Sequence, residues 1–246
     1  MWFDGRFFRK KKIMTDEKIR KKGKDKDGSR LSCVFLIVAA VLAVGLAVWF
    51  GTMKPKSPVT EGEHIEKKGE YWEVDVPTPN ITEGMNDVEG IILHHTATDN
   101  AEHALKTLTT PAGKVSCHVL IDTDGTRYVL APPTAITWHA GKSRLNGRDG
   151  CNDFTIGIEF QGNTVEEPLT EDQIQSAIDY VIPLIHHYNI PLKNIVTHEQ
   201  IRNDFKEAHP KVKAHSKVDV TPEEHTRFMK ALRQRMRAEL FPSFRS

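Results

Sequence analysis

From about residue 89 onward, branched apolar residues gather in short stretches that alternate with longer stretches of helical periodicity. The short stretches are rich in Val and Ile and are bounded by turn residues, which is typical of β-strands. They cover residues 90–95, 117–122, 126–130, 155–160 and 194–198. Asp124 and Gly125 lie between the second and third stretches, and they predict a hairpin turn with positive φ angles.

Two helices are predicted by their N-caps as well as by their apolar spacing. Thr170 is an N-cap with Gln173 three residues later, and apolar residues follow at helical spacing. Thr221 begins the second helix, with Glu224 completing another capping box. A shorter helix is predicted over residues 101–108. Alternating strands and helices of this kind predict an α/β domain, with a single mixed β-sheet flanked by helices.

A different pattern fills residues 31–50, where twenty residues carry no charge. A helix of that length spans about 30 Å, the thickness of a bilayer hydrocarbon core. The stretch exceeds the usual apolar region of a cleaved signal peptide, so an uncleaved transmembrane anchor over residues 31–51 is the favoured interpretation.

Charge predicts how this anchor is oriented. Residues 1–30 contain twelve Lys/Arg and five acidic residues, although the net charge of the whole chain is only +1. Because cations beside a membrane span stay cytoplasmic, we expect a single-pass protein of the cytoplasmic membrane with its globular domain outside. The expected segments are a tail (1–30), an anchor (31–51), a linker (52–87) and a domain (88–241). A basic tail beside a span indicates topology and lipid contact, and no nucleic-acid partner is expected.

Two cysteines, Cys117 and Cys151, fall in the exported part. They could form a disulfide in an oxidising compartment, or both could be small buried apolar residues. Neither has the CxxC spacing of a thiolate zinc site.

Three predicted strands end in a residue that can bind metal or transfer protons. Strand alternation puts His94 on the same face as Ile92, and Glu159 on the same face as Gly157, which leaves open space beside it. His198 ends the third strand. A carboxylate at the end of an apolar strand is costly to bury unless it has a partner or a chemical role.

Five segments carry a family resemblance: HHTAT (94–98), VSCHVLIDTDGT (115–126), WHAG (138–141), CNDFTIGIEFQGN (151–163) and VTH (196–198). In this order and spacing they resemble the zinc-dependent N-acetylmuramoyl-L-alanine amidases, a family that includes peptidoglycan recognition proteins. The resemblance covers about residues 88–240. It implies hydrolysis of the amide between N-acetylmuramic acid and L-alanine in peptidoglycan or muropeptides. The alternative is a non-catalytic peptidoglycan-binding module of the same fold.

The resemblance also implies a metal site. His94 and His198 correspond to the first two zinc ligands, and Asp219 corresponds to the third, shortly before the last helix. Glu159 would be the general base and Lys217 would stabilise the oxyanion. Two histidines and one carboxylate leave zinc a position open for chemistry.

The segment before the last helix departs from the family pattern. It is longer than usual in the wall-recycling members, and Val220 replaces the usual Pro. It also contains alternatives for the third ligand (His209 and His215) and for the lysine (Lys206 and Lys213). Asp219 is favoured because it lies two residues before the capped helix.

The resemblance further implies a substrate-binding group beside the cleft. Its residues are Trp138, His139, His95 and Asn152. Trp138 could equally be a core residue, and Asn152 could serve loop closure.

Overall fold

The computed structural model describes residues 64–213 and 219–240, which belong to one compact unit spanning residues 54–246. The predicted transmembrane anchor and tail lie outside the described residues. Within the described part, no helix has the length and apolar character needed to cross a bilayer.

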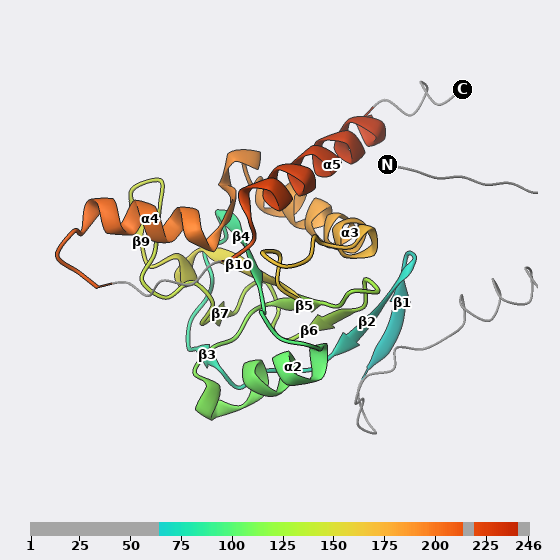
Figure 1. The fold of residues 1–246 in the computed structure, drawn as a ribbon, viewed down its shortest axis with the longest axis horizontal. Coiled ribbons are helices and arrows are strands. Elements are labelled where there is room, and N and C mark those ends of the chain that lie inside the picture. Colours follow the sequence, from blue (N-terminus) through green and yellow to red (C-terminus); the bar gives the residue numbers. More distant parts are fainter. Residues whose placement is uncertain (1–63, 214–218, 241–246) are drawn as a thin grey trace, which may run out of the picture. The chain divides into compact units, whose positions relative to one another are not determined.

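The central sheet contains seven strands in the order β1-β2-β6-β5-β10-β4-β11 (Figure 1). Their bounds are β1 Ile65–Lys68, β2 Tyr71–Asp75, β4 Gly90–His95, β5 Val119–Ile121, β6 Arg127–Val129, β10 Thr155–Phe160 and β11 Ile195–Thr197. Strands β5, β10, β4 and β11 are parallel to their neighbours in that group, whereas β5–β6 and β1–β2 are antiparallel. The predicted mixed sheet is therefore confirmed.

Two small ribbons accompany the main sheet, so the prediction of a single sheet was incomplete. One pairs β3 (Ile81–Thr82) with β7 (Ile136–Thr137), and the other pairs β8 (Arg144–Leu145) with β9 (Arg148–Asp149). Three short 3₁₀ turns connect other segments: η1 Pro111–Gly113, η2 Cys151–Asp153 and η3 Leu192–Asn194.

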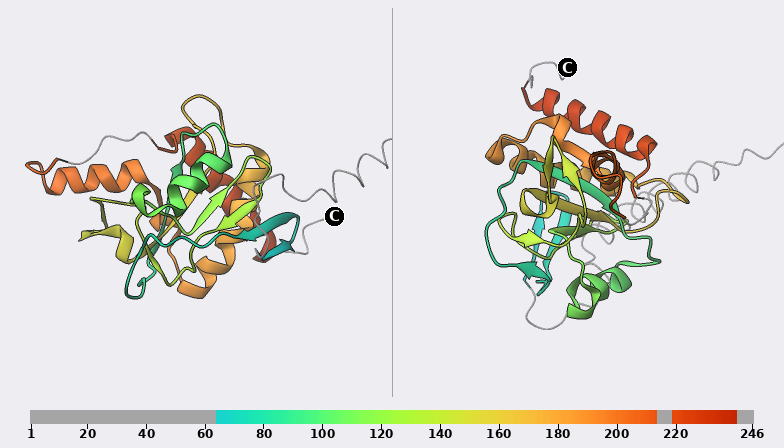
Figure 2. Two further views of the ribbon diagram at one scale, coloured as in Figure 1. Left: turned by 90° about the horizontal axis from the view of Figure 1, so that it is seen from below. Right: turned by 90° about the vertical axis from the view of Figure 1, so that its left-hand side faces the viewer.

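Helices cover both faces of the sheet (Figures 1 and 2). On one face, α3 (Glu171–Tyr188) and α5 (Pro222–Leu240) pack against apolar side chains of the parallel strands. On the other, α2 (Ala101–Thr109) packs over β2, β5 and β6, while α4 (His198–Ala208) packs over β4 and β11.

The N-terminal boundary of the domain was predicted incorrectly. Strands β1 and β2 lie in the stretch expected to be a linker (52–87), yet they belong to the main sheet. A buried ion pair holds them there, because Arg127 Nε donates to Glu73 Oε2 at 3.1 Å. The other guanidinium nitrogens of Arg127 reach the Ser176 and Lys68 carbonyls. The folded domain thus begins before residue 88.

The predicted caps are confirmed at one helix and only half confirmed at the other. Thr170 and Gln173 form the complete capping box of α3. At α5, the Glu224 amide donates to Thr221 Oγ1 at 3.4 Å, but the Glu224 carboxylate accepts from the Leu169 amide instead of returning to Thr221. The carboxylate therefore ties α5 to the segment before α3.

The predicted hairpin turn is present, although only one of its residues has a positive φ. The Gly125 amide donates to the Asp122 carbonyl, and the φ of Gly125 is 80°. Asp124 is not among the positive-φ residues; its carboxylate instead accepts from the Thr126 amide.

Candidate active site

Two neighbouring parallel strands bring His94 and Glu159 together. The register of β10 on β4 pairs Glu159 with His94, so both side chains leave the same face at the carboxyl end of the sheet. Ligand sites in α/β sheets form at this end. His94 is 1% exposed and Glu159 is 8% exposed, so both groups are shielded from bulk water.

His198 comes from the next strand along, but as the first residue of a helix. Strand β11 ends at Thr197, and Thr197 and Gln200 form a complete capping box for α4. The prediction that His198 ends a strand was therefore wrong by one residue. A helix also fills much of the segment expected to be a loop after His198. The Thr-x-x-Gln signature was present in the sequence and could have revealed this helix.

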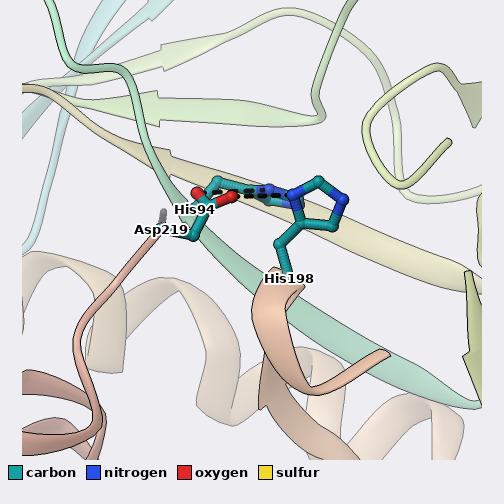
Figure 3. Close-up of side chains that lie close together, drawn as sticks. All are labelled: His94, His198 and Asp219. Atoms are coloured by element: carbon teal, nitrogen blue, oxygen red, sulfur yellow. Dashed lines mark hydrogen bonds and ion pairs between the residues drawn. The ribbon is translucent and has the colours of Figure 1, made fainter. Parts of the chain in front are cut away.

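Asp219 completes the group from the segment just before α5 (Figure 3). Its Oδ2 lies 2.7 Å from His198 Nδ1, and its Oδ1 lies 3.7 Å from His94 Nδ1. The same Oδ1 accepts the backbone amide of His95 at 3.0 Å, which fixes the carboxylate against β4. The sequence-based ligand trio is thus brought together from three separate parts of the chain.

This trio fits a metal ion. One donor atom from each of His94, His198 and Asp219 lies within 4.8 Å of the other two. Two imidazoles and one carboxylate are a donor set that suits zinc and leaves a fourth coordination position.

Among the alternative ligands and lysines, Lys213 lines the cleft beside the trio, and the others lie elsewhere or outside the described residues. His209 Nε2 contacts Asp149 Oδ2 at 2.7 Å, on the β8–β9 ribbon. Lys206 lies in the last turn of α4, whereas Lys213 lines the cleft described next. His215 and Lys217 lie outside the described residues, so the role of Lys217 stays a prediction.

A cleft of about 520 Å³ opens beside the trio, between α2 and α4. His198 and Glu159 both line it, so the candidate metal site and the Glu159 carboxylate border the same space. Its lining also includes four cationic side chains: Lys114, Lys142, Arg202 and Lys213.

Three of the four predicted substrate-binding residues line this cleft: Trp138, His139 and Asn152. The Trp138 indole nitrogen donates to Thr82 Oγ1 at 2.8 Å, which fixes the ring at the β3–β7 ribbon. Asn152 Oδ1 accepts the backbone amides of His139 and Ala140, so it closes this loop as well as lining the cleft.

His95 does not reach the cleft, which argues against its predicted substrate-binding role. It is 2% exposed, and its Nδ1 lies 3.0 Å from Thr164 Oγ1. Strand alternation directs its ring to the face opposite His94. Its backbone amide nevertheless serves the site by holding Asp219.

Two further imidazoles lie buried under the site. His139 Nδ1 is 3.1 Å from His94 Nε2, and the His139 and His118 ring centroids are 5.9 Å apart. Burial lowers the pKa of His118 to about 4 and holds the pKa of His139 well below its ordinary value. Burial thus favours the neutral form of both rings. No local pattern in the sequence predicted this contact, because His139 lies 45 residues from His94.

The two cysteines of the domain are free and buried in different apolar clusters, so they do not pair. Burial raises the pKa of Cys151 to about 11, which makes its thiol a poor nucleophile or ligand.

Comparison with known proteins places the chain in a family. A family model described as N-acetylmuramoyl-L-alanine amidase matches residues 84–214. The chain is 40% identical over 93 residues to the 1,6-anhydro-N-acetylmuramyl-L-alanine amidase AmpD of Escherichia coli K12, an alignment covering 38% of this chain and 50% of that protein. It is 41% identical over 88 residues to AmpD of Haemophilus influenzae, covering 35% and 46%.

The chain thus spans about half the length of the curated relatives it matches. Among solved structures, the crystal structure of a selenomethionine AmpD derivative superposes with a TM-score of 0.50 at 25% identity. That superposition covers 64% of this chain and 92% of the AmpD chain. The matched segment contains His94, Glu159 and His198. On this evidence the chain belongs to the N-acetylmuramoyl-L-alanine amidase family.

Proposed function

We propose that this chain is a zinc-dependent amidase that hydrolyses the bond between N-acetylmuramic acid and L-alanine in peptidoglycan or muropeptides. One observation carries the proposal: His94, His198 and Asp219 converge within 4.8 Å, with Glu159 in register beside His94. Family membership supports the same reaction. The AmpD relatives are named for a 1,6-anhydro-N-acetylmuramyl substrate, so anhydromuropeptides are included among the proposed substrates.

Each residue of the site has a separate role in the proposed reaction. His94, His198 and Asp219 would hold zinc, which supplies Lewis acidity to the scissile carbonyl and to the attacking water. Glu159, on the cleft wall, would take the proton from the water and deliver it to the leaving amine of L-alanine. Lys217 would stabilise the oxyanion of the tetrahedral intermediate. A Lys217→Ala variant that keeps both zinc and full rate would remove that last assignment.

The charge of the cleft supports a peptide substrate of acidic character. Its described lining residues include four cationic side chains (Lys114, Lys142, Arg202 and Lys213) and a single carboxylate, that of Glu159. A muropeptide stem carries several carboxylates, and cations in a partly enclosed cleft attract them. We propose that these side chains orient the stem peptide and that Trp138 contacts its sugar or first residue.

We also propose that the chain is anchored in the cytoplasmic membrane through residues 31–51, with the amidase domain on the outer side. The support is the uncharged stretch at 31–50 and the twelve cations that precede it. Reporter fusions after residue 60 test this, because an alkaline phosphatase fusion should be active and a cytoplasmic reporter inactive. The reverse pattern would contradict the orientation.

The amidase proposal is tested by mass spectrometry of a defined anhydromuropeptide after incubation with the zinc-loaded chain. The expected products are anhydro-N-acetylmuramic acid and a stem peptide with a free L-alanine amino group, and a chelator should abolish them. A substrate that stays intact but binds the protein would instead favour the non-catalytic module.

A further inference from the structure

The two ring nitrogens of His94 face different partners. Its Nδ1 lies 3.7 Å from Asp219 Oδ1, on the side of the proposed metal. Its Nε2 lies 3.1 Å from His139 Nδ1. For His94 to bind a metal through Nδ1, that nitrogen must be unprotonated and the ring proton must lie on Nε2. Something must therefore select this tautomer.

A chain of hydrogen bonds behind His94 makes the selection. The Thr155 hydroxyl lies 2.6 Å from the Cys151 carbonyl and 3.4 Å from His139 Nε2. A carbonyl oxygen can only accept, and a hydroxyl has one proton, so Thr155 donates to Cys151. The Thr155 oxygen is then left as the acceptor for a proton on His139 Nε2.

The remaining steps apply to the neutral imidazole, which is the form favoured for a buried ring that contacts other imidazoles and a hydroxyl. A neutral imidazole carries one ring proton, so with its proton on Nε2, His139 presents an unprotonated Nδ1. That atom accepts from Nε2–H of His94, and His94 Nδ1 is left unprotonated toward Asp219 and His198. In the alternative arrangement, His139 would carry its proton on Nδ1 and donate it to His94 Nε2. The lone pair of His139 Nε2 would then face the Thr155 oxygen. The proton of His94 would lie on Nδ1, where the metal has to bind.

Packing holds in place this hydrogen-bond relay, which consists of His94, His139, Thr155 and the Cys151 carbonyl. His94, His139 and Thr155 are each less than 9% exposed, so water competes little for these bonds. A Cβ on Gly157 would lie 2.5 Å from His139 Cγ, which shows how closely the ring lies against β10. The His139 ring also contacts His118 edge-on.

We propose that His139 is a positioning residue that, through Thr155 and the Cys151 carbonyl, fixes His94 as an Nδ1 metal ligand. The inference rests on the proposed metal site and changes the role of His139 from substrate binding to support of a ligand. Partners of this kind, which bind the second nitrogen of a metal-bound histidine, typically contribute about 10–100-fold to metal affinity.

The first test reads the tautomers directly in the full, metal-free chain at pH 8. Two-bond ¹H–¹⁵N correlation spectra of the histidine rings, assigned with His94→Gln and His139→Asn variants, should show both rings protonated at Nε2. An Nδ1-protonated form of either ring would overturn the relay. This readout needs neither zinc nor substrate.

The second test measures zinc dissociation constants by competition with a chromophoric chelator. His139→Leu keeps much of the volume but has no acceptor, so it should weaken zinc binding about 10–100-fold. His139→Asn can place its amide oxygen near the former Nδ1 and should recover most of that loss. His225→Asn is the control, because it alters a partly buried imidazole whose Nε2 lies 2.9 Å from the Ile195 carbonyl, and it should leave zinc affinity unchanged.

The outcomes separate this inference from the proposed function. A folded His139→Leu variant that binds zinc as tightly as the wild type would overturn the inference alone. A wild-type chain that binds no zinc would instead overturn the proposed function, while the tautomer spectra would still decide the direction of the relay.

Discussion

A methyl group added at Gly157 should displace the His139 ring, which lies next to His94. In Gly157→Ala the new Cβ would lie 2.5 Å from His139 Cγ, 2.7 Å from Nδ1 and 2.8 Å from Cβ. Carbon atoms attract best at about 3.5–4.0 Å, so the His139 ring must move by about 1 Å. Strand β10 cannot recede, because it is hydrogen-bonded to β4 and β5 on both sides. Overpacking of this kind typically costs about 1–3 kcal/mol.

Urea unfolding of the metal-free chain measures this cost, and a double-mutant cycle identifies its source. In a His139→Ala background the ring is absent, so Gly157→Ala should then change the unfolding free energy by no more than about 0.5 kcal/mol. Gly157→Ala alone should also weaken zinc binding in the same direction as His139→Leu. If Gly157→Ala lowers the unfolding free energy equally with and without the His139 ring, the clash with that ring is not the cause. If it changes the unfolding free energy by about zero in both backgrounds, the packing argument is wrong.

Three further predictions concern other parts of the domain. Asp219→Ala should abolish stable zinc binding in a competition titration, whereas His209→Ala should leave it intact. The reverse result would identify His209 as the third ligand. Arg127→Met should destabilise the domain by about 3 kcal/mol in urea, because it leaves the buried Glu73 carboxylate without its guanidinium partner. Burial lowers the pKa of His118 from 6.5 to about 4, so stability should be full above pH 6.5 and should fall by roughly 3 kcal/mol as the pH drops to 4. A His118→Asn variant should show a shallower fall over that range, and an unchanged pH profile would contradict this assignment.

Much of the fold was predictable because its central strands are apolar and regular. The bounds of β4 and β10 agree with the sequence pattern, and the register of the two strands pairs Glu159 with His94. Other elements lacked such a signal. Strands β1 and β2 are short and carry several charges, and they are held by the long-range contact of Arg127 with Glu73.

Within the site, the family resemblance predicted the candidate metal-binding residues, but the sequence could not show which residues support them. Helix α4 is mostly polar, with Ile201 as its one buried apolar residue, so its periodicity was weak and only its cap could have revealed it. The partners of His94 and Asp219 are set by contacts between distant segments. His139 lies 45 residues from His94, and the His95 amide lies 124 residues from Asp219. No local pattern encodes such contacts.

The central claim is that a zinc site made by three ligands works with Glu159 as its base. The most direct measurement is the cleavage rate of an anhydromuropeptide by zinc-loaded Glu159→Gln relative to the wild type, with metal content determined on the same samples. We predict one zinc per chain in both proteins and a rate loss of about 10²–10⁴-fold in the variant. A Glu159→Gln variant that retains zinc and cleaves at the wild-type rate would contradict the account.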